Sequence, residues 1–115
     1  MSTRVDRVAE GIRRLTCEII QSGLKDPRLK GIITVTKVKL TADLRFARIY
    51  YSVLGDDKNK KLVGRGLKSA TPYIRKRIAD RLKLRYAPSI LFKVDEYLEY
   101  AGRIDEILDK LHREG

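Results

Sequence analysis

The chain has 115 residues, of which 43% are hydrophobic and 36% are charged, and its net charge is +11. The single Cys excludes an internal disulfide, and no cluster of Cys and His offers a zinc site. No apolar run approaches the roughly 20 residues that cross a membrane, and the N-terminus lacks the apolar core of a signal peptide. We therefore expect one soluble cytoplasmic domain over residues 1–115, with no metal or other cofactor.

Basic residues are unevenly distributed along the chain. Residues 56–91 hold 11 Lys and Arg against 3 Asp and Glu, whereas residues 92–115 hold 4 against 7. A concentrated positive field is typical of a protein that binds a polyanion such as nucleic acid. The alternative is the charge-rich surface of a thermophile protein, but such a surface should be closer to balanced in sign.

The first predicted element is a helix over residues 3–22. Apolar residues recur there at three- and four-residue steps and form one stripe from Val5 to Ile19. Thr3 is a suitable N-cap for this helix. Three arginines lie together beside the apolar stripe, namely Arg4, Arg7 and Arg14.

Two strands are predicted next, over "IITVTKVKL" (32–40) and "LRFARIYYSVL" (44–54), because both are rich in β-branched and aromatic residues. Alternation in the second strand places Ala47, Ile49, Tyr51 and Val53 on a face that packs against helices. The opposite face carries aromatics and an arginine. Phe46 and Tyr50 on that face are able to stack on unpaired bases, but they are equally ordinary strand aromatics, and we favour that simpler interpretation.

A pair of helices is predicted in the most basic part of the chain. Residues 55–61 are a turn or the start of the first helix, which includes Leu62 to Ala70, and the second helix runs from about residue 72 to 84. Thr71 followed by Pro72 is typical of a helix start, with a hydroxyl N-cap and then a proline at the first helical position. We therefore expect an interhelical kink at Ala70, Thr71 and Pro72. The backbone amides and the positive dipole end of the second helix would favour phosphate at this bend.

The remaining elements are a strand over residues 87–96 and a helix over residues 101–113, seamed by Ile104, Ile107, Leu108 and Leu111. The element order is α-β-β-α-α-β-α, which indicates an α+β fold with a three-stranded sheet. Gly64 and Gly66 form a lone GxG, which is a weak indication of a phosphate-binding loop.

Basic side chains of the helix pair form the predicted RNA-binding surface. Residues 75–85 contain 6 Lys and Arg with Asp80 as the one acidic residue. The first helix contributes Lys60, Lys61, Arg65 and Lys68. The second helix and the turn after it contribute Arg75, Lys76, Arg77, Arg81, Lys83 and Arg85. Arg4, Arg7 and Arg14 extend this surface from the first helix of the chain.

Four stretches together resemble the bacterial ribosome-binding factor A family over nearly the whole chain. They are "RVAEGIRRLTCEII", "DPRLKGIITVTKVKLTADLRFARIYYSVL", "ATPYIRKRIADRLKLRYAPSILFKVDE" and "GRIDEILDKL". The residues that carry the resemblance include Asp26-Pro27-Arg28, Thr34-Val35-Thr36, Asp43-Leu44, Ala47, Ile74-Arg75, Leu84-Arg85, Pro88, Phe92 and Asp95, in this order and at this spacing.

The resemblance implies a KH-like (type II) fold of the order α-β-β-α-α-β. In this family a kink around Ala-x-Gly replaces the usual GxxG phosphate loop, and Ala70-Thr71-Pro72 falls on it. Pro72 stands where the family usually has glycine. A positive φ is therefore excluded at this position, since proline fixes φ near −65°.

The resemblance also implies a function and its partners. Members of the family look like assembly factors that bind the small (30S) ribosomal subunit and its 16S rRNA late in maturation. They are associated with rRNA processing and with growth in the cold, and they leave before translation. The expected partners are the pre-30S particle and, through it, other maturation factors including a GTPase. We expect a monomer.

Two other classes of function are considered. An enzyme would have to use Asp95, Glu96, Glu99 or His112, but acids at a helix N-terminus and a His at a helix C-terminus have adequate structural roles. A permanent ribosomal protein or a general DNA- or RNA-binding protein also fits the charge. However, Arg75, Lys76 and Arg77 are better placed to contact phosphates than to read bases.

Overall fold

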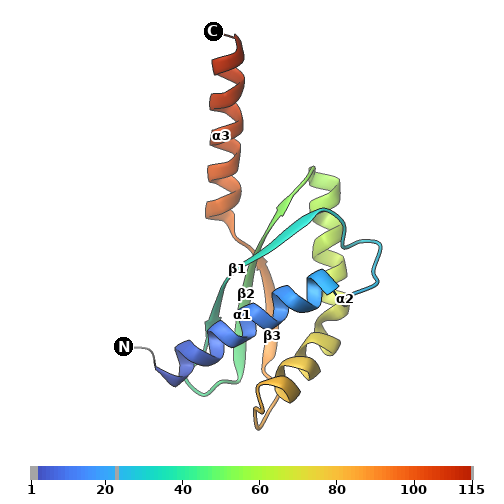
Figure 1. Cartoon of the computed structure of the whole chain (residues 1–115), viewed down its shortest axis with the longest axis vertical. Coiled ribbons are helices and arrows are strands. Elements are labelled where there is room, and N and C mark those ends of the chain that lie inside the picture. The colour runs from blue at the N-terminus through green and yellow to red at the C-terminus, as the bar shows by residue number, and fades with distance from the viewer. Residues whose placement is uncertain (1–2, 23, 115) are drawn as a thin grey trace.

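The computed structural model describes residues 3–22 and 24–114, which form an α+β fold (Figure 1). Within these residues three helices and three strands follow one another in the order α-β-β-α-β-α. They are α1 (Arg4–Ser22), β1 (Ile32–Leu40), β2 (Phe46–Leu54), α2 (Asp57–Arg81), β3 (Ser89–Val94) and α3 (Glu96–Glu114). Among the described residues, no helix is both long and apolar enough to cross a membrane.

The start of α1 confirms the predicted N-cap. The Asp6 backbone N–H donates to Thr3 Oγ1 at 3.1 Å, and the Thr3 N–H donates in return to the Asp6 carboxylate at 3.1 Å. This reciprocal pair satisfies two backbone donors at the helix end. The predicted apolar stripe of α1 is also confirmed, since Ile12, Leu15 and Ile19 are buried.

The sheet has the strand order β1-β2-β3, with β1 antiparallel and β3 parallel to β2. Alternate residues of β2 from Ala47 to Val53 are buried under the helices, as predicted from the alternation. A bulge interrupts the pairing between Val35 and Lys37, so Thr36 has no direct partner on β2. The extra residue shifts the alternation, so that Val35 and Val38 both contribute to the core.

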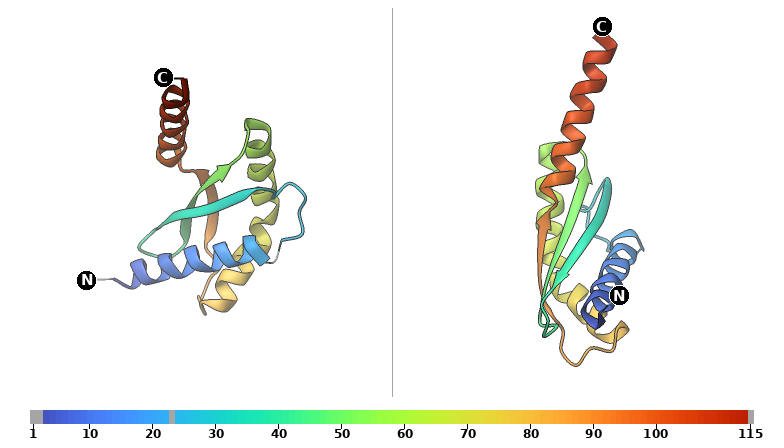
Figure 2. Two further views of the ribbon diagram at one scale, coloured as in Figure 1. Left: turned by 45° about the horizontal axis from the view of Figure 1, so that its top comes forward. Right: turned by 90° about the vertical axis from the view of Figure 1, so that its left-hand side faces the viewer.

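Helix α2 differs from the sequence prediction, because it is one helix that runs through Pro72 rather than two separate helices. Thr71 is not an N-cap: its hydroxyl donates to the Leu67 carbonyl at 2.9 Å, one turn back within the same helix. The N-cap is Asp56, whose carboxylate accepts the Asn59 N–H at 2.7 Å. The expected change of direction remains, since the ribbon of α2 bends near its middle (Figures 1 and 2).

Packing on both sides of Pro72 explains why the helix continues. Val63 and Leu67 before the proline are buried against the end of β2, while Ile74 and Ile78 after it are buried against α1 and the middle of the sheet. Burial of each such side chain contributes about 1.5–3 kcal/mol. Four of them outweigh the roughly 3 kcal/mol that a proline costs in a helix interior.

Helix α3 begins at Glu96, earlier than the predicted residue 101. Asp95 causes the early start: one carboxylate oxygen accepts the Leu98 N–H at 3.3 Å and the other accepts the Thr36 hydroxyl at 2.7 Å. The helix then projects from the sheet along the long axis of the molecule (Figures 1 and 2). All four residues of its predicted apolar seam are exposed, from 38% at Ile104 to 61% at Leu111.

Candidate nucleic-acid interface

The solvent side of α2 carries a row of basic side chains. The core-facing side is fixed by Val63, Leu67, Ile74 and Ile78, which follow one another at helical spacing. The opposite side of the helix bears Lys58, Lys61, Arg65, Lys68 and Lys76, all of them exposed, and we call this set the α2 stripe. Lys58 was not among the predicted residues, although its three-residue distance from Lys61 places it in the same row.

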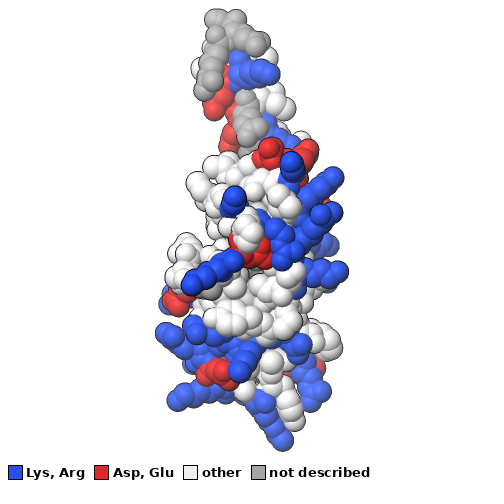
Figure 3. Space-filling view, turned by 90° about the vertical axis from the view of Figure 1, so that its right-hand side faces the viewer, with Lys and Arg blue, Asp and Glu red and all other residues white. Residues whose placement is uncertain are grey.

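Figure 3 shows the side of the molecule on which α2 lies in Figure 1. Lys and Arg side chains gather along its right margin and around its lower end, with fewer Asp and Glu between them. Positive charge therefore forms a surface in three dimensions and not only a dense segment of the sequence.

Two of the predicted basic residues of α2 are half-buried and lie apart from the α2 stripe. Lys60 is half-buried and lines a hollow with Tyr97, Tyr100 and other residues at the start of α3. Arg75 is also half-buried, and its Nε donates to the Pro88 carbonyl at 2.8 Å. Its Nη2 is 3.3 Å from the carbonyl of the preceding residue. The Arg75 guanidinium thus fixes the chain segment that enters β3.

The end of α2 comes earlier than predicted, at Arg81 rather than at residue 84. Lys83 has a φ of 53°, in the left-handed region, and the Leu84 N–H donates to the Ala79 carbonyl at 3.0 Å. This arrangement ends the helix in a tight turn. Arg77, Arg81 and Lys83 are all exposed around this end of the helix.

A second group of cations forms where three distant segments meet. Arg4 of α1, Arg45 of the β1–β2 turn, and Arg85 with Tyr86 of the α2–β3 turn line one hollow of about 350 Å³. The Tyr86 ring centre lies 4.9 Å from the Arg45 guanidinium carbon and 5.4 Å from that of Arg85. We call these four residues the arginine cluster. Arg45 was missed because it is isolated in the sequence from the other basic residues.

The other predicted α1 arginines are placed differently. Arg7 is exposed, whereas Arg14 Nε lies 3.3 Å from the Glu10 carboxylate. Glu10 also pairs with Arg13 at 2.6 Å. The Arg13 hydrogen bond, with a smaller contribution from Arg14, lowers the pKa of Glu10 to about 2. Arg14 therefore faces an ionised carboxylate at neutral pH.

The bend of α2 does not present the amides that the sequence prediction placed there. The backbone is helical on both sides of Pro72, so the N–H groups after it lie inside a continuous helix. Proline itself has no N–H with which to bond the Lys68 carbonyl. The prediction of a helix N-terminus for phosphate at this bend is therefore wrong. Any anion at this bend must be held by side chains.

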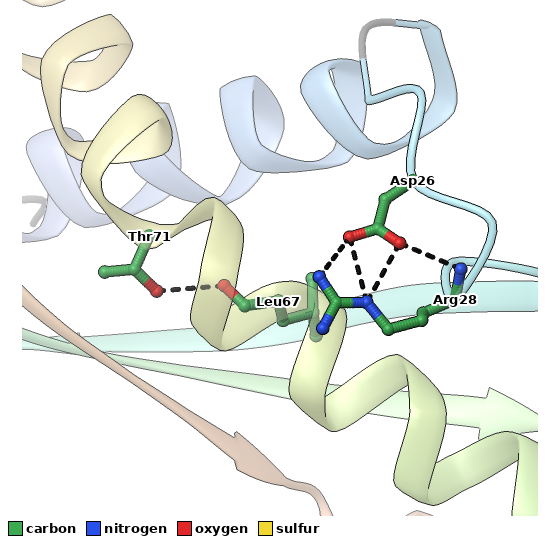
Figure 4. Close-up of polar contacts among 4 residues, drawn as sticks. All are labelled: Asp26, Arg28, Leu67 and Thr71. Carbon is green, nitrogen blue, oxygen red and sulfur yellow. Dashed lines mark hydrogen bonds and ion pairs between the residues drawn. The ribbon is translucent and has the colours of Figure 1, made fainter.

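Gly64 and Gly66 lie inside α2, where Gly66 serves packing rather than phosphate binding. A Cβ on Gly66 would lie 2.9 Å from a methyl carbon of Leu29. The loop that carries Leu29 is fixed by Asp26, which accepts the Arg28 backbone N–H at 2.9 Å and forms an ion pair with its guanidinium at 2.6 Å (Figure 4). The glycine lets this loop approach the helix closely.

Of the residues named for catalysis, Asp95 has a structural role and the Glu99 side chain lies outside the described part of the chain. The pKa of Asp95 is lowered, first by the Thr36 hydroxyl and also by the N–H groups at the start of α3. His112 is exposed on the far part of α3. Among the residues whose side chains the structure describes, no three His, Cys, Asp or Glu side chains gather where they could hold a metal ion.

The family model of ribosome-binding factor A matches residues 4–108. The chain belongs to the ribosome-binding factor A family. Ribosome-binding factor A of Geobacter metallireducens is 46% identical over 114 residues, which cover 99% of this chain and 96% of that protein. The protein of Caldanaerobacter subterraneus is 39% identical, covering 99% of this chain and 93% of that protein.

Solved structures of ribosome-binding factor A share the fold. The crystal structure from Thermus thermophilus matches with a TM-score of 0.69 at 25% identity, covering 80% of this chain and 97% of that one. The solution structure of a Thermotoga maritima protein described as a putative ribosome-binding factor A matches at 0.68 and 36% identity, covering 76% and 82%. A Thermus thermophilus model fitted into the electron-microscopy map of a 30S complex matches at 0.60 and 26% identity, covering 74% and 88%. These likenesses confirm the predicted family and fold class.

Several residues through which the chain resembles the ribosome-binding factor A family prove to have structural roles. Asp26 and Arg28 fix the loop that packs on α2. Thr36 and Asp95 join the bulge of β1 to the start of α3. Arg75 joins α2 to the entry of β3. The exposed cations of the α2 stripe are therefore the better candidates for contacts with a partner.

Proposed function

We propose that this chain is a non-catalytic assembly factor that binds the small ribosomal subunit through its 16S rRNA. The observation that carries the proposal is the α2 stripe, a row of exposed cations on one helix of a chain that belongs to the ribosome-binding factor A family. A fitted model of the Thermus thermophilus relative in a 30S complex supports the choice of partner. Phosphate contacts of this kind supply affinity and position rather than sequence selection.

The proposal also covers the oligomeric state of the chain and the place and time at which it acts. The chain acts as a monomer in the cytoplasm, late in maturation of the subunit and while rRNA processing is completed. Other maturation factors, including a GTPase, are met through the particle rather than by a separate site on this chain. Activity of this kind matters most in the cold, where misfolded rRNA is slower to rearrange.

The residues that we assign to rRNA contact differ from the sequence prediction in a few places. Lys58 joins Lys61, Arg65, Lys68 and Lys76 in the α2 stripe, and Arg45 joins Arg4 and Arg85 in the arginine cluster. Arg77, Arg81 and Lys83 lie near the end of α2 and extend the surface toward the arginine cluster. Arg7 is exposed one turn after Arg4 and remains part of the proposed surface. Lys60 and Arg75, which are half-buried, and Arg14, which pairs with Glu10, are not included.

Co-sedimentation with immature small subunits, mature small subunits and whole ribosomes at near-physiological salt tests the proposal. Retention on small subunits and loss from whole ribosomes is expected for a transient assembly factor. Equal retention on all three would instead favour a permanent ribosomal protein or adhesion of a polycation. The Arg65→Gln/Lys68→Gln variant should be retained less than the wild type. The Arg103→Gln/Lys110→Gln variant, which removes the same charge from α3, should be retained equally well.

A further inference from the structure

The sheet surface that faces away from α1 and α2 is basic and partly apolar. We call its basic part the open face. Strand pairing places on the open face Lys37 and Lys39 of β1, Phe46, Arg48 and Tyr50 of β2, and Ser89, Leu91 and Lys93 of β3. The structure describes all three strands throughout, and none of their outward positions carries Asp or Glu. The open face therefore has a positive field without a compensating charge of its own.

A hollow of about 420 Å³ lies in the open face, and its lining includes Lys39, Phe46, Arg48 and Leu91. Lys39 pairs with Arg48, and Arg48 pairs with Leu91, so the three residues form one row across the sheet. Phe46 lies on the same face of β2, two residues before Arg48, and pairs with Ser89. Phe46 and Leu91 are each 58% exposed. An aromatic ring and an aliphatic side chain thus lie in the open beside two cations.

Tyr50 holds the neighbouring cations in place. Lys37 Nζ lies 4.6 Å and Lys39 Nζ 5.7 Å from its ring centre, and Arg48 Nη1 donates to its hydroxyl at 3.3 Å. The Arg48 hydrogen bond, followed by the charges of Arg48 and the two lysines, lowers the pKa of Tyr50. Because ammonium groups lie over the Tyr50 ring, Phe46 offers the freer aromatic surface for stacking.

The sequence alone favours an ordinary strand role for Phe46, but its exposure beside two cations favours stacking. We propose that the open face binds an unpaired RNA segment. A base stacks on Phe46 and Leu91, and the flanking phosphates pair with Lys39 and Arg48. Aromatic side chains beside a positively charged groove are the usual means of holding single strands, because every base has a face that can stack. A paired strand is excluded from this mode, since its base faces are already stacked within the duplex.

This inference deepens the proposed function and rests on it in taking RNA as the ligand. The α2 stripe lies on the helical side of the molecule and the open face on the other side of the sheet. The two surfaces can therefore hold two RNA segments at once, a structured one on the helical side and an unpaired one on the sheet. Linked contacts of this kind raise the overall affinity without requiring either site to be strong.

Fluorescence anisotropy with two probes separates the surfaces. The first probe is fluorescein-labelled decauridylate, which stays unpaired, and the second is a labelled RNA duplex of similar charge. Phe46→Ala should weaken decauridylate binding at least about fivefold, as expected for loss of one stacked base. Leu54→Ala is the control, since Leu54 is 65% exposed on the same side of the sheet but lies outside the open face. It should change the affinity less than twofold.

Duplex binding and a charge variant complete the test. Phe46→Ala should leave duplex binding unchanged, whereas Arg65→Gln/Lys68→Gln should weaken it. Lys39→Gln/Arg48→Gln should flatten the salt dependence of decauridylate binding.

Equal effects of Phe46→Ala and Leu54→Ala would overturn the proposal. The proposal would also be overturned if Phe46→Ala bound decauridylate normally but was no longer retained on small subunits, because the open face would then bind a protein. If the wild type bound decauridylate but did not sediment with small subunits, the small subunit would be refuted as the partner, and the RNA site on the open face would stand.

Discussion

At the scale of single residues, Asp95 joins three elements through its carboxylate and its backbone N–H. It accepts the Thr36 hydroxyl from the bulge of β1 and the Leu98 N–H from α3, and its own N–H donates to the Tyr51 carbonyl of β2 at 2.7 Å. The residue is buried, at 8% exposure. The direction taken by α3 therefore depends on this residue.

The lowered pKa of Asp95 gives a pH-dependent prediction. Its stabilising effect is complete above the unfolded-state pKa of about 3.9 and is lost as the pH falls through the lower folded-state pKa. Asp95→Asn keeps a good cap but removes the charge, so the free energy of unfolding at pH 7 should fall by about 1 kcal/mol. Urea unfolding between pH 7 and pH 3 measures this. The difference from the wild type should shrink toward pH 3. Asp105→Asn, at an exposed site of α3, should change the free energy of unfolding at pH 7 by no more than about 0.5 kcal/mol.

Arg75 gives a second prediction at this scale. Arg75→Ala removes the donors to the carbonyls of Ala87 and Pro88, and it should lower the free energy of unfolding by about 1–3 kcal/mol. Arg77→Ala removes the same charge from an exposed site and should change stability by no more than about 0.5 kcal/mol. Equal stabilities of the two variants in urea would show that the Arg75 hydrogen bonds do not hold the segment before β3.

At the scale of elements, the contact between α2 and the loop before β1 depends on Gly66. Gly66→Ala raises helix propensity by about 1 kcal/mol, but its Cβ would meet Leu29 at 2.9 Å. We expect a net loss of about 1–3 kcal/mol from overpacking. Gly64→Ala is the matched control, because its nearest neighbour is the Tyr51 hydroxyl oxygen at 3.3 Å. Thermal unfolding should rank Gly66→Ala below Gly64→Ala, and the reverse order would refute the packing role.

Elements that follow a simple periodicity were predictable from the sequence. The stripe of α1 and the alternation of β2 identify their buried faces because burial repeats regularly along each element. The continuity of α2 was not predictable in this way. Thr71 and Pro72 carry the local signal for a new helix, and it is overridden by burial of Leu67 and Ile74 on either side, which only the assembled core provides.

The candidate site was predictable only in part, for the same reason. Charge density in the sequence identifies Arg65 and Lys68 because they lie among other basic residues. It also selects Arg75, although the side chain is used within the fold. It misses Arg45, which joins Arg4 only because the β1–β2 turn folds back beside α1. No pattern in the local sequence predicts the bulge at Thr36, which determines the face of the sheet on which Lys37 and Lys39 lie.

At the scale of the whole molecule, charge is separated along an axis 57 Å long. Residues 56–91 carry 11 basic and 3 acidic residues, whereas residues 92–115 carry 4 and 7. In the field of a polyanion such a molecule turns its basic body toward the ligand and α3 away from it. The exposed apolar seam of α3 would then point away from the RNA.

The α2 stripe gives the prediction at this scale. If Arg65 and Lys68 each neutralise one phosphate, the slope of log affinity against log salt should fall by about 1.5–2 in Arg65→Gln/Lys68→Gln. Fluorescence anisotropy with an rRNA duplex between about 50 and 300 mM salt measures this slope. Arg103→Gln/Lys110→Gln should keep the wild-type slope. A change of the same size in both variants would mean that net charge alone governs binding.

Pro72 also separates α2 into two halves, which we expect to unfold locally at different free energies. Val63 and Leu67 belong to one buried cluster, Ile74 and Ile78 to another, and the Lys68 carbonyl at their boundary cannot receive a bond from Pro72. Each half of α2 is thus tied more strongly to its own cluster than to the other half. Native-state hydrogen exchange should therefore divide the amides of α2 into two groups with different opening free energies. A single helix would then belong to two units that open independently, and the turns before the proline could yield to a partner while those after it stay closed.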